Sequence, residues 1–94
     1  MTTQLISKRS GRALANQFVI TTDDCTFFQS YRSFIAKVDK NGVVTLSSWW
    51  DYSNTTRKYL YAFLSEFGYY DLNANKVRKL LADKTFKYQQ IITM

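Results

Sequence analysis

The chain contains no histidine and no proline, and its 94 residues include only one cysteine and three glycines. Without histidine, the usual general base near neutral pH and the commonest nitrogen ligand for metal ions are both missing. The single cysteine, Cys25, cannot form a disulfide within the chain. Without a histidine it also makes neither a zinc-finger pattern nor a Cys-His nucleophile. The glycines form no phosphate-binding loop motif. We therefore expect no catalytic residues, no metal site and no cofactor.

Long apolar runs are absent as well. No stretch approaches the roughly 20 apolar residues that cross a membrane. The first residues, MTTQLISKRSGRALANQF, lack the apolar segment of a secretory signal. We expect an intracellular protein without membrane contact. Since 46% of the residues are hydrophobic and 17% are aromatic, a packed core is feasible, and residues 1–94 are expected to form a single small domain.

The net charge of +6 comes from 13 basic and 7 acidic residues, and it is concentrated towards both ends of the chain. Residues 1–22 carry three bases and no acid, and residues 52–94 carry seven bases and three acids. Between them, residues 23–51 are close to neutral, with three bases and four acids. A basic balance suits a phosphate-bearing partner such as nucleic acid, although solubility alone also produces it.

Apolar periodicity predicts an α+β fold in which a three-stranded antiparallel β-meander precedes two α-helices. Alternating residues predict strands at 17–22, 26–39 and 43–50. Between the last two strands, Asn41-Gly42 predicts a two-residue hairpin with a type I′ turn, which needs positive φ at both positions. We therefore expect three sequential strands, each paired with the next.

The period of the apolar residues changes after the third strand, which predicts the first helix. Ser53 or Asn54 can cap its start by accepting hydrogen bonds from free backbone N–H groups, and Gly68 ends it. A second helix is expected at about 74–84, with Asn73 as its cap.

The two ends of the chain are less clearly patterned. Residues 86–92, FKYQQII, could form a short C-terminal strand or an irregular tail. Residues 1–15 are polar and mixed, and Ser10-Gly11 favours a turn, so this segment is a candidate for a flexible arm.

The stretch WWDYSNTTRKY, residues 49–59, concentrates bulky aromatic rings and positive charge where a strand is expected to give way to a helix. Successive strand side chains point to opposite faces, so Trp49 and Trp50 cannot both face one core. Trp50 shares its face with Val44 and Leu46, the more apolar set. We therefore expect Trp50 to be buried and Trp49 to be at least partly exposed.

Arg57 and Lys58 fall in the first turn of the expected helix, where the macrodipole disfavours each cation by about 0.3–1 kcal/mol. Natural sequences tend to break such local rules at functional sites. Beside exposed Trp49 and Tyr52, these cations could hold phosphate while the rings stack on bases. The alternative is a structural corner with tolerated surface charges. Residues of the second strand and of the basic amino-terminal segment extend the candidate binding set, which comprises Trp49, Tyr52, Arg57, Lys58, Arg12, Tyr31 and Arg32.

Three segments together resemble a family of small proteins encoded by bacteriophages and mobile elements of low-GC Gram-positive bacteria. The family pattern includes an FQSY.S.I strand and a WDYS.TT.KY…FL junction, and both occur here in the same order. The resemblance implies an origin more than an activity, and it suggests that the cation at Lys58 is not incidental. The segments that carry it are GRALANQFVITT (11–22), FFQSYRSFIAKVD (27–39) and WDYSNTTRKYLYAFL (50–64).

Two functional hypotheses follow. In the first, the chain is a phage-type accessory protein of the host cytoplasm, without catalytic activity, that contacts nucleic acid or a nucleoprotein complex as a monomer or homodimer. In the alternative, it inhibits or modulates a host defence or replication protein by protein–protein contact, as anti-CRISPR or anti-restriction proteins do. A basic protein does not mimic DNA, so such an inhibitor would dock on an acidic protein surface or on bound guide RNA.

Overall fold

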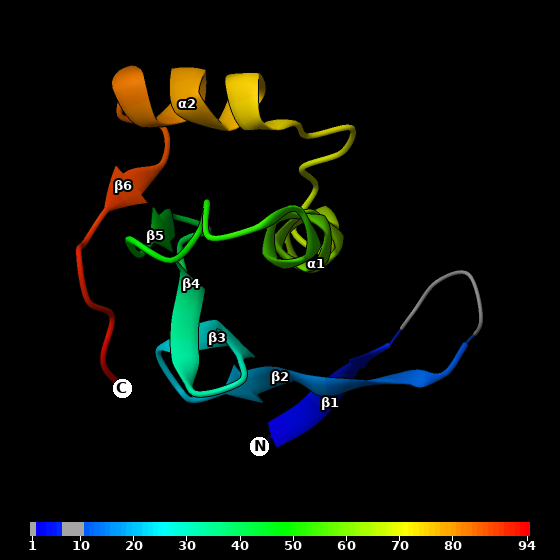
Figure 1. Cartoon of the computed structure of the whole chain (residues 1–94). Helices are drawn as coiled ribbons and strands as arrows, with labels where there is room; N and C mark the ends of the chain where they lie inside the picture. Colours follow the sequence, from blue (N-terminus) through cyan, green and yellow to red (C-terminus); the bar gives the residue numbers. More distant parts are fainter. Residues whose placement is uncertain (1, 7–10) are drawn as a thin grey trace.

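Among residues 2–6 and 11–94, which the computed structural model describes, six strands form one mixed sheet and two helices follow the fifth strand (Figure 1). Each strand lies beside the next one in the chain. The α+β class is confirmed, whereas the expected three-stranded meander has too few strands. The elements are β1 (Thr2–Ile6), β2 (Ala13–Thr21), β3 (Cys25–Ser30), β4 (Ser33–Asp39), β5 (Val44–Leu46), α1 (Asn54–Ser65), α2 (Ala74–Ala82) and β6 (Lys87–Tyr88).

The segment 26–39, expected as one long strand, is a hairpin of two strands, β3 and β4. Tyr31 and Arg32 form the turn between them, and Tyr31 has a left-handed backbone with a φ of 55°. Sequence alternation misses this turn because neither of its two central residues is glycine, asparagine, aspartate or proline, and the flanking serines are weaker turn signals. As a result, every neighbouring pair from β1 to β5 is antiparallel.

A β-bulge in β4 turns two consecutive residues towards the same core. Phe28 pairs with Ala36, but the next residue, Gln29, pairs with Phe34, so Ile35 is an extra residue in the strand. Ile35 and Ala36 therefore both join the core, with 2% and 0% of their surfaces exposed. Strict alternation would assign them to opposite faces.

The hairpin between β4 and β5 forms as expected, but its loop is not a type I′ turn. Gly42 has a φ of 84°, whereas Asn41 does not have the positive φ that this turn requires. Instead, Asp39 Oδ1 accepts hydrogen bonds from the backbone N–H groups of Asn41 and Val43, at 2.9 and 3.0 Å. An aspartate side chain thus closes the loop.

Both helices begin where the capping residues predict. The Ser53 hydroxyl oxygen accepts a hydrogen bond from the Thr56 N–H at 3.1 Å, and Asn73 Oδ1 accepts one from the Lys76 N–H at 2.9 Å. The first helix ends shortly before Gly68, whose φ of 91° lets the chain reverse. The residues of α1 that are buried are Thr56, Leu60, Phe63 and Leu64.

The main core lies between α1 and one face of the sheet. Figure 1 shows α1 end-on against this face, with α2 above it near β5 and β6. The rings of Phe28 on β3 and Phe63 on α1 stack with their centroids 5.5 Å apart. The buried residues of this core are Phe28, Ile35, Ala36, Val38, Val44, Leu46, Trp50, Leu60, Phe63, Leu64, Val77 and Phe86.

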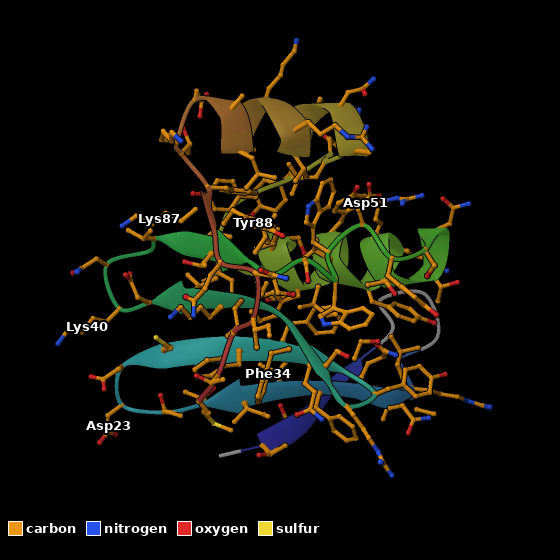
Figure 2. The ribbon with its side chains drawn as sticks, turned by 60° about the vertical axis from the view of Figure 1, so that its left-hand side comes forward. Asp23, Phe34, Lys40, Asp51, Lys87 and Tyr88 are labelled. Atoms are coloured by element: carbon orange, nitrogen blue, oxygen red, sulfur yellow. The ribbon has the colours of Figure 1, made fainter. Side chains whose placement is uncertain are left out.

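Residues 86–92 form both of the alternatives that the sequence allowed, a short strand and an irregular tail. The short strand β6 pairs in parallel with β5, and the chain then continues as an irregular tail. In Figure 2 the chain beyond Tyr88 crosses the sheet face opposite to α1, where Phe34 lies. Ile92 in this tail is buried, and the ring of Phe34 packs against Phe27 at 5.5 Å. The sheet is therefore covered on both faces.

Part of the candidate flexible arm lies in the sheet. β1 pairs with β2, with Thr2 opposite Ile20 and Gln4 opposite Phe18. β2 then begins at Ala13, before the end of the proposed arm. Residues 1 and 7–10 lie outside the described residues.

Candidate functional site

Trp49 and Trp50 lie in a turn that follows β5, not in a strand. Hydrogen bonds run from the Trp50 N–H to the Ser47 carbonyl at 3.2 Å and from the Tyr52 N–H to the Trp49 carbonyl at 3.1 Å. The Ser47 hydroxyl donates to a carbonyl of β4 at 2.7 Å and accepts from the Trp49 N–H at 3.2 Å. The expected strand 43–50 is therefore wrong at its carboxyl end, because a serine side chain ends the pairing and starts the turn.

The burial expected for the two tryptophans is confirmed, although strand alternation is not its cause. Trp50 is 7% exposed and belongs to the core, whereas Trp49 is 44% exposed. The turn directs the two rings apart. Trp49 packs on Tyr52 in an edge-to-face arrangement with ring centroids 5.7 Å apart, and Tyr52 is itself 72% exposed. An aromatic pair therefore lies at the surface just before α1.

An open cavity of about 760 Å³ lies between this aromatic pair, the first turns of α1, and β2, β3 and β4. Its size is within the range of small-molecule sites. Three strongly exposed rings, those of Tyr31, Trp49 and Tyr52, are called here the aromatic rim. The remaining wall is mostly polar and consists of Ala15, Gln17, Ser30, Ser33, Ile35, Ser53, Thr55, Thr56 and Tyr59.

Gln17 is a buried polar residue in the wall of this cavity. It is only 2% exposed, and the pairing of β2 with β3 sets it opposite Ser30. Both share the sheet face that carries Val19 and Phe28, so the apolar row of the core becomes polar at the cavity. The Gln17 Oε1 atom has no hydrogen-bond partner among the described residues.

Two residues with left-handed backbone meet at the edge of the cavity. Asn16 has a φ of 62° and Tyr31 a φ of 55°, and the Tyr31 N–H donates to the Asn16 carbonyl at 2.7 Å. This conformation costs a non-glycine residue about 1–3 kcal/mol, and such strain clusters at binding sites. It holds the Tyr31 ring at the aromatic rim, where the ring is 65% exposed.

Arg57, expected in the binding patch, belongs to a network of ion pairs. Its guanidinium donates to Asp51 and to Asn54. The second carboxylate oxygen of Asp51 accepts from Arg78 of α2 at 3.1 Å, and Figure 2 shows Asp51 between the two helices. The Arg78 guanidinium also lies 5.9 Å from the ring centroid of Trp50. Asp51 thus offsets the unfavourable cation at the start of α1 and connects both helices.

This network predicts that substitutions of the two adjacent cations differ in their effect on stability. Arg57→Glu should lower the free energy of unfolding by about 1 kcal/mol, because it removes a partner from Asp51 and adds a like charge. Lys58→Glu should leave it nearly unchanged, because Lys58 is exposed, belongs to neither ion pair of Asp51 and lies just beyond the first turn of α1. Urea unfolding of the two single variants measures both. Equal changes in the two proteins would contradict the role given to Asp51.

Of the three remaining basic candidates, Lys58 and Arg32 are neighbours of residues that line the cavity, and Arg12 is not. Lys58 is exposed, and its Nζ is 5.9 Å from the ring centroid of Tyr59, a wall residue. Arg32 is exposed and follows Tyr31 in the β3–β4 turn. Arg12 is exposed before the start of β2 and does not line the cavity. The fold therefore gathers the aromatic candidates around one cavity, with Lys58 and Arg32 next to wall residues.

The hydroxyl group of Tyr61 is a second buried polar group without a partner among the described residues. Burial raises the pKa of this phenol above its ordinary value. Arg57 and Arg78 act to lower the pKa and Asp51 acts to raise it. Tyr61 does not line the cavity, and its side chain packs against the main core.

Within residues 2–6 and 11–94, no group of three or more histidine, cysteine, aspartate or glutamate side chains could hold a metal ion. Neither of the helices described is long and apolar enough to cross a membrane.

The sequence-based interpretation missed most of the polar wall. Gln17 was assigned to a strand and given no role, although a large polar residue two positions before Val19 on the same strand face was a usable signal. Ser30 and Ser33 carried no such signal, because the turn between them was not recognised. Tyr59 lay on the predicted helix, but no local feature indicated that it would face β2 and β3 across a cavity.

A comparison with protein families places the chain in one of them. Residues 1–84 match the family described as "Family of unknown function (DUF8033)". The chain belongs to this family. The match to DUF8033 extends beyond the residues of the earlier resemblance and includes the whole cavity wall and both helices. No curated protein and no solved structure matches the chain.

Proposed function

We propose that this member of DUF8033 is a non-catalytic binding protein that holds single-stranded nucleic acid at the junction between β5 and α1. The observation that carries the proposal is the aromatic rim around an open cavity. Single exposed rings are common on protein surfaces, whereas a group of exposed rings around one cavity is typical of a binding site. Here the exposed rings come from two separate parts of the chain, the β3–β4 turn and the turn before α1.

The charge around the rim supports a phosphate-bearing partner. Arg32 and Lys58 are exposed beside the rim and the cavity wall, and the chain carries a net charge of +6. The cavity wall itself contains no acidic residue. Aromatic rings that stack on bases, flanked by cations that hold the backbone, are the usual means of binding single strands.

A single strand suits this surface better than a duplex. The bases of a duplex are already stacked and paired, so exposed rings could reach them only after unpairing, which costs a few kcal/mol. Bases of a single strand are free to leave their neighbours and stack on Trp49, Tyr52 or Tyr31. The first turn of α1, which faces the cavity, adds the partial positive charge of a helix start.

Fluorescence anisotropy with labelled oligonucleotides tests the proposal. Single-stranded DNA or RNA is expected to bind at low salt, and more tightly than the matching duplex. If about three cations contact phosphate, the logarithm of the association constant should fall with the logarithm of salt concentration with a slope of about −2. Absence of binding to every strand at low salt would refute the proposal.

The second candidate function is an inhibitor or modulator of a host defence or replication protein. Tyr88, Ile91 and Met94 favour it, because each is more than half exposed in the carboxy-terminal segment, away from the cavity wall. If no nucleic acid binds, this alternative becomes the leading one. In either case we propose a phage-type accessory role in the cytoplasm of a Gram-positive host, with the chain acting as a monomer or homodimer.

A further inference from the structure

The sheet face opposite to α1 has a cavity of its own, of about 410 Å³, beside the β4–β5 hairpin. Its wall includes Lys37 of β4, Thr45 of β5 and Lys87 of β6. Val44 and Leu46, on either side of Thr45, belong to the main core, so the side chain of Thr45 points to the opposite face. This cavity is therefore separate from the one at the aromatic rim.

Strand pairing sets the two lysines on either side of Thr45. Lys37 pairs with Thr45 across β4 and β5, and Thr45 pairs with Lys87 across β5 and β6. Residues paired in this way share one face of the sheet. The Cα atoms of the two lysines are two strand spacings apart, about 10 Å. Both long side chains can therefore reach a group that lies over Thr45.

These three side chains have no partner within the part of the chain that the structure describes. Neither lysine takes part there in an ion pair or a side-chain hydrogen bond, although Lys37 is half-buried. Thr45 is only 7% exposed, and its hydroxyl has no hydrogen-bond partner among the same residues. Its oxygen is not one of the unpaired atoms that are cut off from solvent, so it is open to the cavity. Polar groups buried to this extent are normally paired, which indicates that a ligand supplies the partner.

We infer that this cavity binds a phosphate group, which Lys37 and Lys87 hold by charge and to which the Thr45 hydroxyl donates a hydrogen bond. Phosphate carries several acceptor oxygens and can engage all three donors at once. Asp39 also lines the cavity, but its Oδ1 accepts two backbone N–H groups of the β4–β5 loop, and the two ammonium groups outnumber its single charge. Because the aromatic rim is on the other face of the sheet, the inference does not rest on the proposed function.

Titration of the isotope-labelled parent protein with sodium phosphate, followed by NMR, is the primary test. Sodium chloride at matched ionic strength is the reference. We expect the amide signals of Lys37, Thr45 and Lys87 to shift along one saturable curve in phosphate and to stay nearly unchanged in chloride. No saturable shift at these residues, or equal shifts in chloride, would overturn the inference. This titration needs no variant, so it does not depend on how a substitution affects folding.

Lys37→Met and Thr45→Val are the matching tests on the protein, and both keep the approximate size of the side chain. Each removes one donor to a charged group, so phosphate binding should weaken about tenfold. Lys40→Met removes an exposed lysine that does not line this cavity and should leave the binding unchanged. An equal loss in Lys40→Met would mean that phosphate responds only to net charge, and the site would be rejected.

The phosphate group could belong to a nucleic-acid strand or to a small phosphorylated molecule, and Lys37→Met combined with Lys87→Met distinguishes these sources. If the strand occupies the cavity, the salt dependence of single-strand binding should become less steep by about 1.4 in the logarithmic slope, as for two lost contacts. If the slope is unchanged while inorganic phosphate no longer binds, the ligand is a small molecule. Either result supports the site. If no strand binds to the parent protein, the proposed function fails, and the phosphate titration still decides the inference.

Discussion

Trp50→Ala is expected to lower the free energy of unfolding by about 3–5 kcal/mol, as the truncation of a large buried ring does. Trp50 is 7% exposed within the main core, and Arg78 of α2 packs over its ring. The variant therefore loses both core volume and one of the contacts between α2 and the turn. Since domains of this size are stable by about 5–15 kcal/mol, the loss is a large share of the total.

The neighbouring residue provides the matched control for this experiment. Trp49→Ala removes the same side chain one position earlier, but Trp49 is 44% exposed and contacts Tyr52 edge to face. Its cost should be about 0.5–1.5 kcal/mol, the value of an aromatic pair. Urea unfolding followed by far-UV circular dichroism measures both variants without relying on tryptophan fluorescence. Similar losses in the two proteins would contradict the division of roles between them.

Replacing both Trp49 and Tyr52 with alanine should reduce the affinity for single-stranded nucleic acid by about 30-fold or more. Each base that stacks on an aromatic side chain contributes about 1–3 kcal/mol, so the loss of two rings costs at least about 2 kcal/mol. The fold should persist, because both rings are exposed and neither belongs to the main core. Anisotropy titrations at a fixed salt concentration measure the loss, and circular dichroism checks the fold.

The control for this double variant removes two other exposed rings. Tyr70 and Tyr88 are 68% and 57% exposed, and neither lines the cavity. Tyr70→Ala with Tyr88→Ala should therefore leave binding unchanged. If this control variant loses as much affinity as the first, the strand is not bound at the aromatic rim. Since neither pair carries charge, the salt dependence of binding should be retained in both variants.

Features of the fold that depend on neighbouring residues could be predicted well from the sequence. The caps at Ser53 and Asn73 each act over three residues, and the structure has both. The apolar stripe of α1 and the hairpin between β4 and β5 are likewise local patterns. The α+β class follows from these elements, so it was predictable as well.

The strand count could not be predicted in the same way, because β1 lies in the segment expected to be an arm and the two central turn residues, Tyr31 and Arg32, are not typical of turns. The left-handed backbone of Tyr31 is maintained by the partner that it finds at Asn16, on a different strand. The bulge at Ile35 is also a product of pairing, since it exists only relative to β3. Local residue propensities predict neither the hydrogen bond between Tyr31 and Asn16 nor the bulge at Ile35.

The same distinction between local sequence and tertiary packing applies to the candidate site. The sequence by itself determined that aromatic rings and cations would lie around the start of α1, because those residues are close together in the chain. That Asp51 could offset the cations at the start of α1 was a local expectation, but only the tertiary structure decided that Asp51 would also pair with Arg78 of α2 and that Gln17 and Tyr59 would line one cavity. The physical reason is that ion pairing and burial depend on which distant elements meet, and that is set by the packing of the whole chain.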